Sequence, residues 1–307
     1  MSDNATTQRT RDFYEQFHFP GNRPVDRDGL IFLRRFTNSI AQRSSGRGAR
    51  VLRVLDAGCG TGNTSVSLAR SFPSVAFEGL DQSEGSLAEA RALAARQGVK
   101  NLRLQRWNIL QPLPFDEPFD IALCLGVLHH TADMPACLGN LQRALADDGL
   151  LYLWIYGKHG RCRHALNMRL LALLLRDTAA PAERVALAAQ FARKACDGAM
   201  LRDLAGSGQA ELLHSAVSDD PVWIADQFLN PQETLLDLPE TLTMARAAGF
   251  ALEQVLGMDA DVAGCLAVPE LYERYRRLDA EEQLEALDLL LKPERYFLVL
   301  RTTRRGG

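Results

Sequence analysis

The residues best placed to do chemistry lie in the stretch Leu55-Asp-Ala-Gly-Cys-Gly-Thr-Gly62 and at the end of the next apolar run. Glycines at three alternating positions follow the carboxylate of Asp56. Glycine lets the backbone turn and approach a ligand closely where a Cβ would clash. Asp81 ends the following apolar run, where a carboxylate can accept hydrogen bonds from both hydroxyls of a ribose. The pattern predicts a nucleotide site at the ends of two strands.

The glycine spacing distinguishes two kinds of nucleotide ligand. A diphosphate cofactor favours Gly-x-Gly-x-x-Gly, with the pyrophosphate on a helix N-terminus. Here the spacing is Gly-x-Gly-x-Gly, and a carboxylate beside the loop suits a ligand that carries an ammonium and a sulfonium. Residues 55–62 resemble motif I of the class I S-adenosylmethionine (SAM)-dependent methyltransferases. The other interpretation is a different Rossmann-like nucleotide domain.

Five strand-like runs alternate with helical patterns between residues 51 and 156. This alternation predicts an α/β fold, a Rossmann-like, doubly wound, seven-stranded and mostly parallel sheet. The strand over 296–302 is expected to be antiparallel, as is typical of the resembled fold. Ligands bind at the carboxyl ends of such strands, where five candidate residues stand. They are Asp56, Asp81, Asn108, Gly126 and Tyr156.

The chain divides into four predicted parts. An N-terminal helical cap covers 1–50, and a SAM-binding Rossmann core covers 51–157. A helical insertion or lid follows over 158–234, where alanine, leucine and arginine recur at helical spacing. Residues 235–307 return to the core with the last two strands. The resemblance is strong over 50–157 and rests on topology alone over 235–302.

The resemblance implies which residues bind SAM. Asp56 and the glycine loop lie near its methionine portion, Asp81 holds the ribose, and Asn108 and Ile109 meet the adenine. The family usually has Asp where this chain has Asn108, whose amide oxygen can still accept a hydrogen bond. The residues expected to bind the cofactor are Asp56, Gly58, Gly60, Gly62, Asp81, Gln82, Asn108, Ile109, Leu125, Gly126 and His130.

Three residues are candidates for catalysis: Tyr14, His129 and Tyr156. Tyr14 lies in an aromatic N-terminal segment that either caps the SAM pocket or only docks that segment on the domain. His129 and His130 point in different directions, so they form a poor metal pair, and no metal is expected. Loop orientation or packing is the favoured role of each histidine. General base is the alternative, with His129 the better candidate by exposure.

A polar and aromatic stretch over 219–231 is the candidate acceptor site. Trp223, Asp226, Gln227 and Asn230 could line a pocket under the insertion; alternatively the stretch is a surface loop anchored by Trp223 and Phe228. Lys158, Arg161 and Arg163 could hold an acidic acceptor, although a solvated loop is the favoured interpretation.

Bulk properties exclude several classes of partner. The net charge is −3, which argues against a nucleic-acid-binding protein. No apolar stretch reaches the length that spans a membrane. The six cysteines form no Cys-x-x-Cys pair, which is typical of reduced thiols in a cytoplasmic protein. The amphipathic insertion could form a homodimer surface.

The favoured function is methyl transfer from SAM to a small-molecule acceptor by in-line displacement. Placement of the reactants and exclusion of water are the main tasks, so a dedicated base is not required. The resemblance also admits a methyltransferase-like enzyme that cyclises SAM to azetidine-2-carboxylate and methylthioadenosine. A third hypothesis is a non-catalytic SAM-binding protein.

Overall fold

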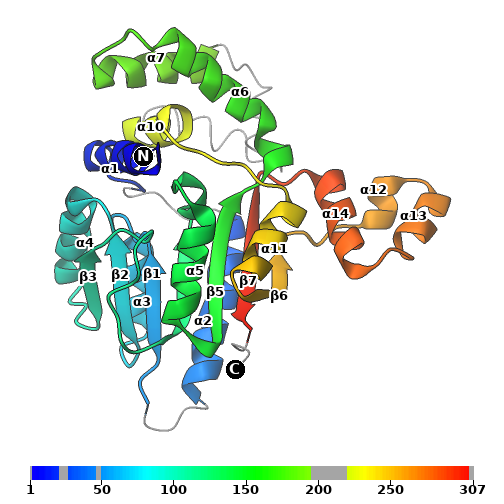
Figure 1. Ribbon diagram of the computed structural model, residues 1–307, viewed down its shortest axis with the longest axis horizontal. Coiled ribbons are helices and arrows are strands. Elements are labelled where there is room, and N and C mark those ends of the chain that lie inside the picture. Colours follow the sequence, from blue (N-terminus) through cyan, green and yellow to red (C-terminus); the bar gives the residue numbers. More distant parts are fainter. Residues whose placement is uncertain (1, 21–26, 46–49, 195–219, 304–307) are drawn as a thin grey trace.

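The computed structural model describes residues 2–20, 27–45, 50–194 and 220–303 (Figure 1). Its seven-stranded sheet has the order β3-β2-β1-β4-β5-β7-β6. Strands β1 to β5 pair in parallel, whereas β7 is antiparallel to both β5 and β6. The predicted Rossmann-like, mostly parallel sheet and its antiparallel last strand are confirmed. The strands are β1 Arg53–Ala57, β2 Ala76–Asp81, β3 Leu102–Arg106, β4 Phe119–Leu125, β5 Leu145–Tyr156, β6 Phe250–Leu256 and β7 Arg295–Thr302.

Helices precede, connect and follow the strands. The first group comprises α1 Ser2–Gln16, α2 Arg27–Ser45, α3 Asn63–Ser71, α4 Glu84–Arg96, the short 3-10 helix η1 Leu128–His130 and α5 Met134–Ala144. The second comprises α6 Lys158–Leu174, α7 Pro181–Lys194, α10 Pro221–Leu229 and α11 Leu238–Ala247. The last comprises α12 Val262–Leu266, α13 Pro269–Tyr275 and α14 Ala280–Leu291.

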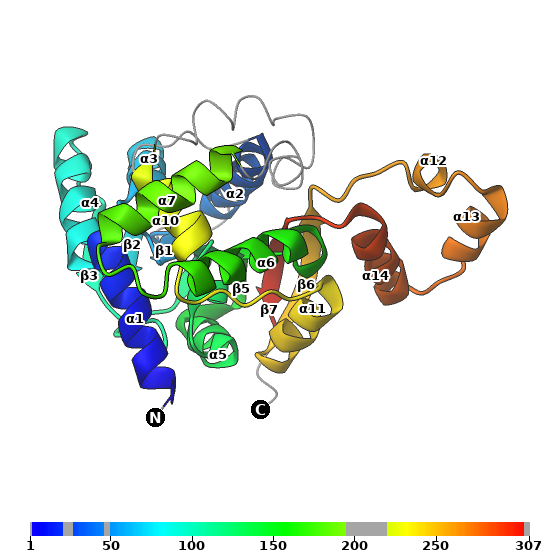
Figure 2. The same ribbon diagram turned by 90° about the horizontal axis from the view of Figure 1, so that it is seen from above.

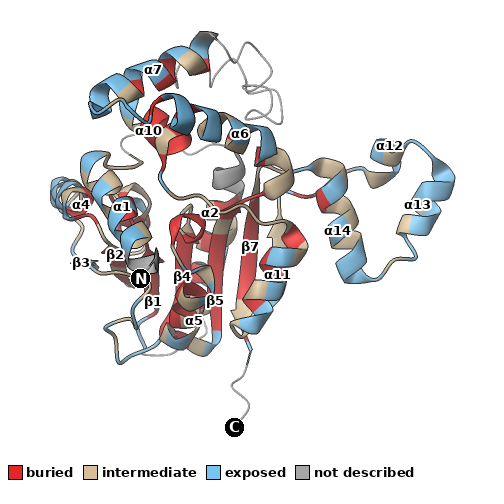
Figure 3. Ribbon diagram, turned by 45° about the horizontal axis from the view of Figure 1, so that its top comes forward, coloured by how far each residue is buried: buried red, intermediate tan, exposed pale blue. Residues whose placement is uncertain are grey.

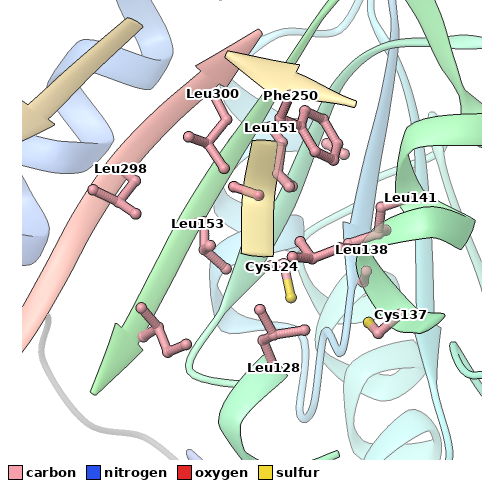
Figure 4. Packing of buried hydrophobic residues seen from close by; sticks show 14 of the residues in the cluster. Cys124, Leu128, Cys137, Leu138, Leu141, Leu151, Leu153, Phe250, Leu298 and Leu300 are labelled. Carbon is pink, nitrogen blue, oxygen red and sulfur yellow. The ribbon is translucent and has the colours of Figure 1, made fainter. Parts of the chain in front are cut away.

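Helices cover both faces of the sheet, as the apolar sequences of its central strands require. Phe32, Phe36 and Ile40 of α2 pack on one face with residues of α3. Residues of α5 and α11 pack on the other, where Leu138 and Leu141 belong to the same apolar cluster as Cys124 of β4 and Leu153 of β5 (Figure 4). The central strands are therefore almost wholly buried (Figure 3).

A third apolar cluster lies beyond the end of the sheet where β5 runs into α6. It joins α6, α7 and α10 to the aromatic rings of Phe13, Phe17 and Phe19 near the end of α1 (Figure 1). The N-terminal segment and the insertion thus pack on each other. Residues 195–219 of the predicted insertion lie outside the described residues.

Within the stretch predicted as a possible surface loop over 219–231, residues 221–229 form helix α10, most of which is buried, so that alternative is wrong. Asp220 caps α10 by accepting from the N–H groups of Val222 and Trp223. Pro221 suits the first turn, where its missing N–H costs nothing. Trp223 and Phe228 are anchors, as predicted, but they face the third cluster.

Helices α12, α13 and α14 project to one side of the molecule (Figure 2). In the sequence they lie between β6 and β7, and they leave the sheet at the carboxyl end of β6, the edge strand opposite to β3. No helix in the described ranges is long and apolar enough to cross a membrane.

Candidate functional site

A cavity of about 150 Å³ lies at the carboxyl ends of β1, β2 and β4. Its lining includes the glycine loop after β1 and residues of α1, which lies above that end of the sheet (Figure 1). The structure therefore brings ten of the residues predicted from the sequence to one cavity. They are Tyr14, Asp56, Gly58, Gly60, Asp81, Gln82, Ile109, Leu125, Gly126 and His130.

Asp56 is the last residue but one of β1, and it is almost wholly buried. The hydroxyl of Ser65, in the first turn of α3, donates to its Oδ2 atom. Burial raises the pKa of Asp56 to about 6. The nearby charge of Asp81 also raises this pKa, whereas the hydrogen bond from Ser65 lowers it. Burial disfavours the ionised form of this carboxylate, and a cation bound beside it would stabilise that form.

Asp81 ends β2 and holds the glycine loop in place. Its Oδ2 atom accepts from the N–H of Gly60 at 2.8 Å, and its Oδ1 atom accepts from the N–H of Ser83 at 2.9 Å. Gly60 has a φ of +52°, and a Cβ there would clash with the carbonyl of Phe19. Burial raises the pKa of Asp81 as well. Each carboxylate oxygen keeps a lone pair for a ligand.

Two predicted cofactor residues lie outside the cavity lining. Gly62 is the N-cap residue of α3 and packs against Ala90 of α4. A side chain at this position would clash with Ala90, so the close contact of the two helices requires glycine here. The Oδ1 atom of Asn108 accepts from the N–H of Leu110 at 3.0 Å and closes a local turn. Trp107 lines the cavity instead, beside Ile109, and its indole N–H has no partner among the described residues.

The turn after β4 separates the two histidines. Gly126 has a φ of +72°, and a Cβ there would clash with the indole of Trp154. The following helix η1 directs His130 to the cavity, where its Nδ1 atom lies 2.7 Å from the carbonyl oxygen of Gln232. His129 is 0% exposed and packs 4.2 Å from the ring of Tyr156, centroid to centroid.

The expectation that His129 is the more exposed histidine is wrong. Neither of its ring nitrogens has a hydrogen-bond partner in the described part of the chain. Burial lowers its pKa well below the usual value, and the positive charges of His130 and Arg161 act in the same direction. A neutral imidazole sealed among aromatic rings is a packing group.

Tyr14 reaches from α1 into a buried polar network on α10. Its hydroxyl donates to Oδ1 of Asp226 at 2.9 Å and accepts from Nδ2 of Asn230 at 2.9 Å. The Nε2 group of Gln227 donates to Oδ2 of Asp226 and to the hydroxyl of Tyr156, at 2.9 and 2.8 Å. Tyr156, Asp226 and Gln227 do not line the cavity, and neither does Trp223. They lie behind Tyr14.

Arg161 is the charge at the centre of this network. It is 0% exposed, donates to both carboxylate oxygens of Glu233 at 2.8 and 2.9 Å, and donates to Glu294 at 3.1 Å. Its guanidinium carbon lies 3.5 Å from the centroid of the Tyr156 ring. The prediction of a solvated or acceptor-binding arginine is wrong at this position. Lys158 pairs with Asp237 and Glu240.

Sequence reasoning missed Glu15, which fixes α1 to the core. Its carboxylate accepts from the N–H groups of Glu84 and Gly85 at the start of α4, at 2.9 and 3.0 Å. A carboxylate at a helix N-terminus is favoured by the helix dipole. Nothing in the local sequence indicates this contact, because its two sides are about 70 residues apart. Within the described ranges, no cluster of His, Cys, Asp and Glu could hold a metal ion.

Comparisons with known proteins agree with this geometry. Residues 50–165 match a family model described as a methyltransferase domain. An uncharacterised Synechococcus protein is 36% identical over 123 residues, which are 40% of this chain and 30% of that protein. Trans-aconitate 2-methyltransferase from Deinococcus radiodurans is 32% identical over 114 residues, or 37% of this chain and 42% of that enzyme. The chain thus covers less than half the length of these relatives.

A solved structure extends the likeness beyond residues 50–165. PKMT2 from Rickettsia typhi, in complex with AdoHcy, superposes with a TM-score of 0.64 at 14% identity, covering 83% of this chain and 49% of that one. At this identity the match shows the fold alone. With the sequence matches and the sheet order, it shows that the chain carries a methyltransferase domain of the class I SAM-dependent family.

Proposed function

We propose that this chain transfers the methyl group of SAM to a small-molecule acceptor. The observation that carries the proposal is the convergence of two carboxylates, the buried Asp56 and the half-buried Asp81, on one cavity at the ends of adjacent parallel strands. SAM would supply a methyl group already activated by its sulfonium. The chain then has to position both reactants and exclude water.

The residues present fit this cofactor better than a dinucleotide. Asp56 suits the positive charges of the aminobutyryl sulfonium portion, and Asp81 can accept from ribose hydroxyls. Trp107 and Ile109 offer apolar contacts to a base. A diphosphate would face two carboxylates in a desolvated site, where like charges repel strongly.

Two observations support a small acceptor. The lining of the cavity includes Tyr14 of α1 together with Phe19 and Pro20, so the N-terminal segment forms part of the wall. The D. radiodurans relative is named as a methyltransferase of a small molecule, trans-aconitate. We infer that Asp226 and Gln227 position Tyr14 over this site and do not contact the acceptor themselves.

Calorimetry with SAM tests the cofactor site. Asp81→Ala removes two ribose contacts and releases the glycine loop, so the affinity should fall about 100-fold, as expected for lost charge-assisted hydrogen bonds. Asp116→Ala, at an exposed acid in the loop before β4, is the matched control and should bind like the wild type. An unchanged affinity in Asp81→Ala would overturn the assignment of this site.

Product analysis by mass spectrometry tests the reaction. The wild-type chain is incubated with SAM alone and with small phenols, amines and carboxylic acids. Methylated acceptor together with S-adenosylhomocysteine supports methyl transfer. Methylthioadenosine formed from SAM alone would instead indicate cyclisation of the cofactor. Tight SAM binding with neither product would indicate a binding protein.

A further inference from the structure

Only one of the two adjacent histidines can meet a ligand. His130 lines the cavity, beside Gly126 at the end of β4 and facing the side of Tyr14. The centroids of the His130 and Tyr14 rings are 6.2 Å apart. His129 is buried behind it, 4.2 Å away between ring centroids. A role in chemistry therefore falls to His130, the residue that sequence reasoning assigned to cofactor binding.

The hydrogen bond at Nδ1 decides which nitrogen of His130 can take a proton. Its partner is the carbonyl oxygen of Gln232, which can only accept, so the Nδ1 atom carries the hydrogen. In the neutral ring, Nε2 then presents a lone pair. Among the described residues Nε2 has no hydrogen-bond partner, and it is not sealed from solvent as both nitrogens of His129 are.

The backbone that orients His130 is itself held in place. The N–H of Gln232 donates to Oδ1 of Asn230 at 3.1 Å, and the N–H of Thr234 donates to the carbonyl of His129 at 2.9 Å. Asn230 also donates to Tyr14. The segment after α10 therefore fixes both polar side chains, His130 and Tyr14, that face the cavity from this side.

The charged groups behind Tyr14 are paired with one another. Burial raises the pKa of Asp226, whose carboxylate accepts from the hydroxyl of Tyr14. The buried guanidinium of Arg161 is balanced by the carboxylates of Glu233 and Glu294.

Tyr14 is poorly suited to the same task. Its hydroxyl hydrogen is donated to Asp226, and burial and the charge of Asp226 raise its pKa well above the usual value. A phenol in this state holds its proton at neutral pH. Tyr14 can orient an acceptor through its oxygen but cannot deprotonate one.

We propose that His130 is the general base of the reaction, and that the acceptor is a hydroxyl or amino compound whose nucleophile carries a proton. This inference rests on the proposed methyl transfer. The acceptor gives its proton to Nε2 and forms a bond to the methyl carbon, while the electron pair of the broken carbon–sulfur bond stays on sulfur. The imidazolium later releases the proton to water. A free carboxylate would gain nothing from such a base.

His130→Asn tests the base, because the Asn side-chain N–H can still donate to the carbonyl of Gln232. SAM affinity should stay within about two-fold by calorimetry. With a phenol or amine acceptor, the rate of S-adenosylhomocysteine formation at pH 7 should fall by a factor on the order of 10²–10⁴. The rate should recover as the pH rises, because the acceptor then ionises by itself. His159→Asn, on α6 away from the cavity, is the matched control and should not change the rate.

Two results would overturn the assignment of His130 as the base. The His130→Asn variant could react at the rate of the wild type, or its rate could be reduced by the same factor at every pH. The pH profile reflects His130 together with the groups around it, namely Asp226, Tyr14, Tyr156, His129 and Glu233. The wild-type profile is therefore compared with that of His130→Asn and not with free imidazole.

A readout without any acceptor separates this inference from the proposed function. Long-range proton–nitrogen NMR of the wild-type chain, with and without S-adenosylhomocysteine, should show a neutral His130 ring protonated at Nδ1. The His130→Asn variant identifies the signal. A neutral ring that carries its proton on Nε2 would overturn the assignment of His130 as the base for any acceptor. If SAM fails to bind the wild type, the proposed function is wrong, yet the tautomer can still be read in the ligand-free chain.

Discussion

The two sides of the cavity are built in opposite ways. On the side formed by the strand ends, the polar contacts are local: Ser65 donates to Asp56 from nine residues away, and Gly60 donates to Asp81 from 21 residues away. On the side formed by α1 and α10, the main contacts join residues far apart in the sequence. Tyr14 and Asp226 are 212 residues apart, and Arg161 and Glu294 are 133 apart.

The two sides also differ in how completely their carboxylates are neutralised. Asp56 and Asp81 line the cavity, have raised pKa values and have no cationic partner among the ion pairs of the described residues. Glu233 and Glu294 share the guanidinium of Arg161 behind Tyr14. The comparison indicates that the strand-end side is available to bind a cation, whereas the helical side holds other residues in place.

The largest effect should come from removing the charge on the helical side. Arg161→Met leaves Glu233 and Glu294 buried without their counter-ion, which should lower the free energy of unfolding by about 3–5 kcal/mol. Urea denaturation of the variant measures this loss. Arg169→Met, at an exposed position of the same helix, is the matched control and should change stability by less than about 0.5 kcal/mol.

The strand-end side should be affected much less by the same substitution. Methylthioadenosine would occupy only the proposed adenine and ribose positions on this side, so its affinity for folded Arg161→Met should stay close to that of the wild type. A stability equal to that of Arg169→Met would contradict the view that the network holds the helical side together.

The same difference explains what the sequence could predict. The sheet, and Asp56 and Asp81, follow from local patterns of apolar runs, glycines and acids, whereas the antiparallel direction of the last strand follows from the resemblance to the methyltransferase fold. Gly62 and Asn108 belong to the same local patterns but lie outside the cavity lining. Gly62 packs closely against α4, and the side-chain oxygen of Asn108 accepts a hydrogen bond within a local turn.

The helical side could be predicted only as a collection of residue types. Tyr14, Asp226 and Gln227 were recognised as polar groups with aromatic neighbours, but their pairing depends on how α10 packs against α1. The basic stretch that contains Arg161 favours a solvated loop, with an acidic-acceptor site as the alternative, and neither interpretation indicates a buried ion pair. The two carboxylate partners of Arg161 lie 72 and 133 residues further along the chain, beyond any spacing rule.

A smaller effect of opposite sign should follow from replacing His129, which lies beside the helical network without a hydrogen bond to it. His129→Phe removes two unpaired buried nitrogens from an aromatic environment, which should raise the free energy of unfolding by about 2 kcal/mol. Urea denaturation measures this increase, provided that the dependence of the unfolding free energy on urea concentration is the same as in the wild type. A loss of stability, with the near-ultraviolet dichroism of the wild type retained, would show that His129 has a polar partner after all.

The smallest effect should come from titration on the strand-end side. Asp56 titrates near pH 6 in the free chain, and a bound cation favours its ionised form, so protons and SAM compete. Below pH 6 the carboxylate must lose a proton before SAM binds, and one pH unit below the pKa the affinity should be about 10-fold weaker. Calorimetry between pH 7 and pH 5 measures this decline. Methylthioadenosine lacks both cationic groups but keeps the ribose, so its own pH dependence reports Asp81 and can be subtracted. Asp56→Asn should bind SAM with the pH dependence of methylthioadenosine. If the affinities of SAM and methylthioadenosine for the wild type decline equally with falling pH, the cationic groups of SAM do not lie beside Asp56.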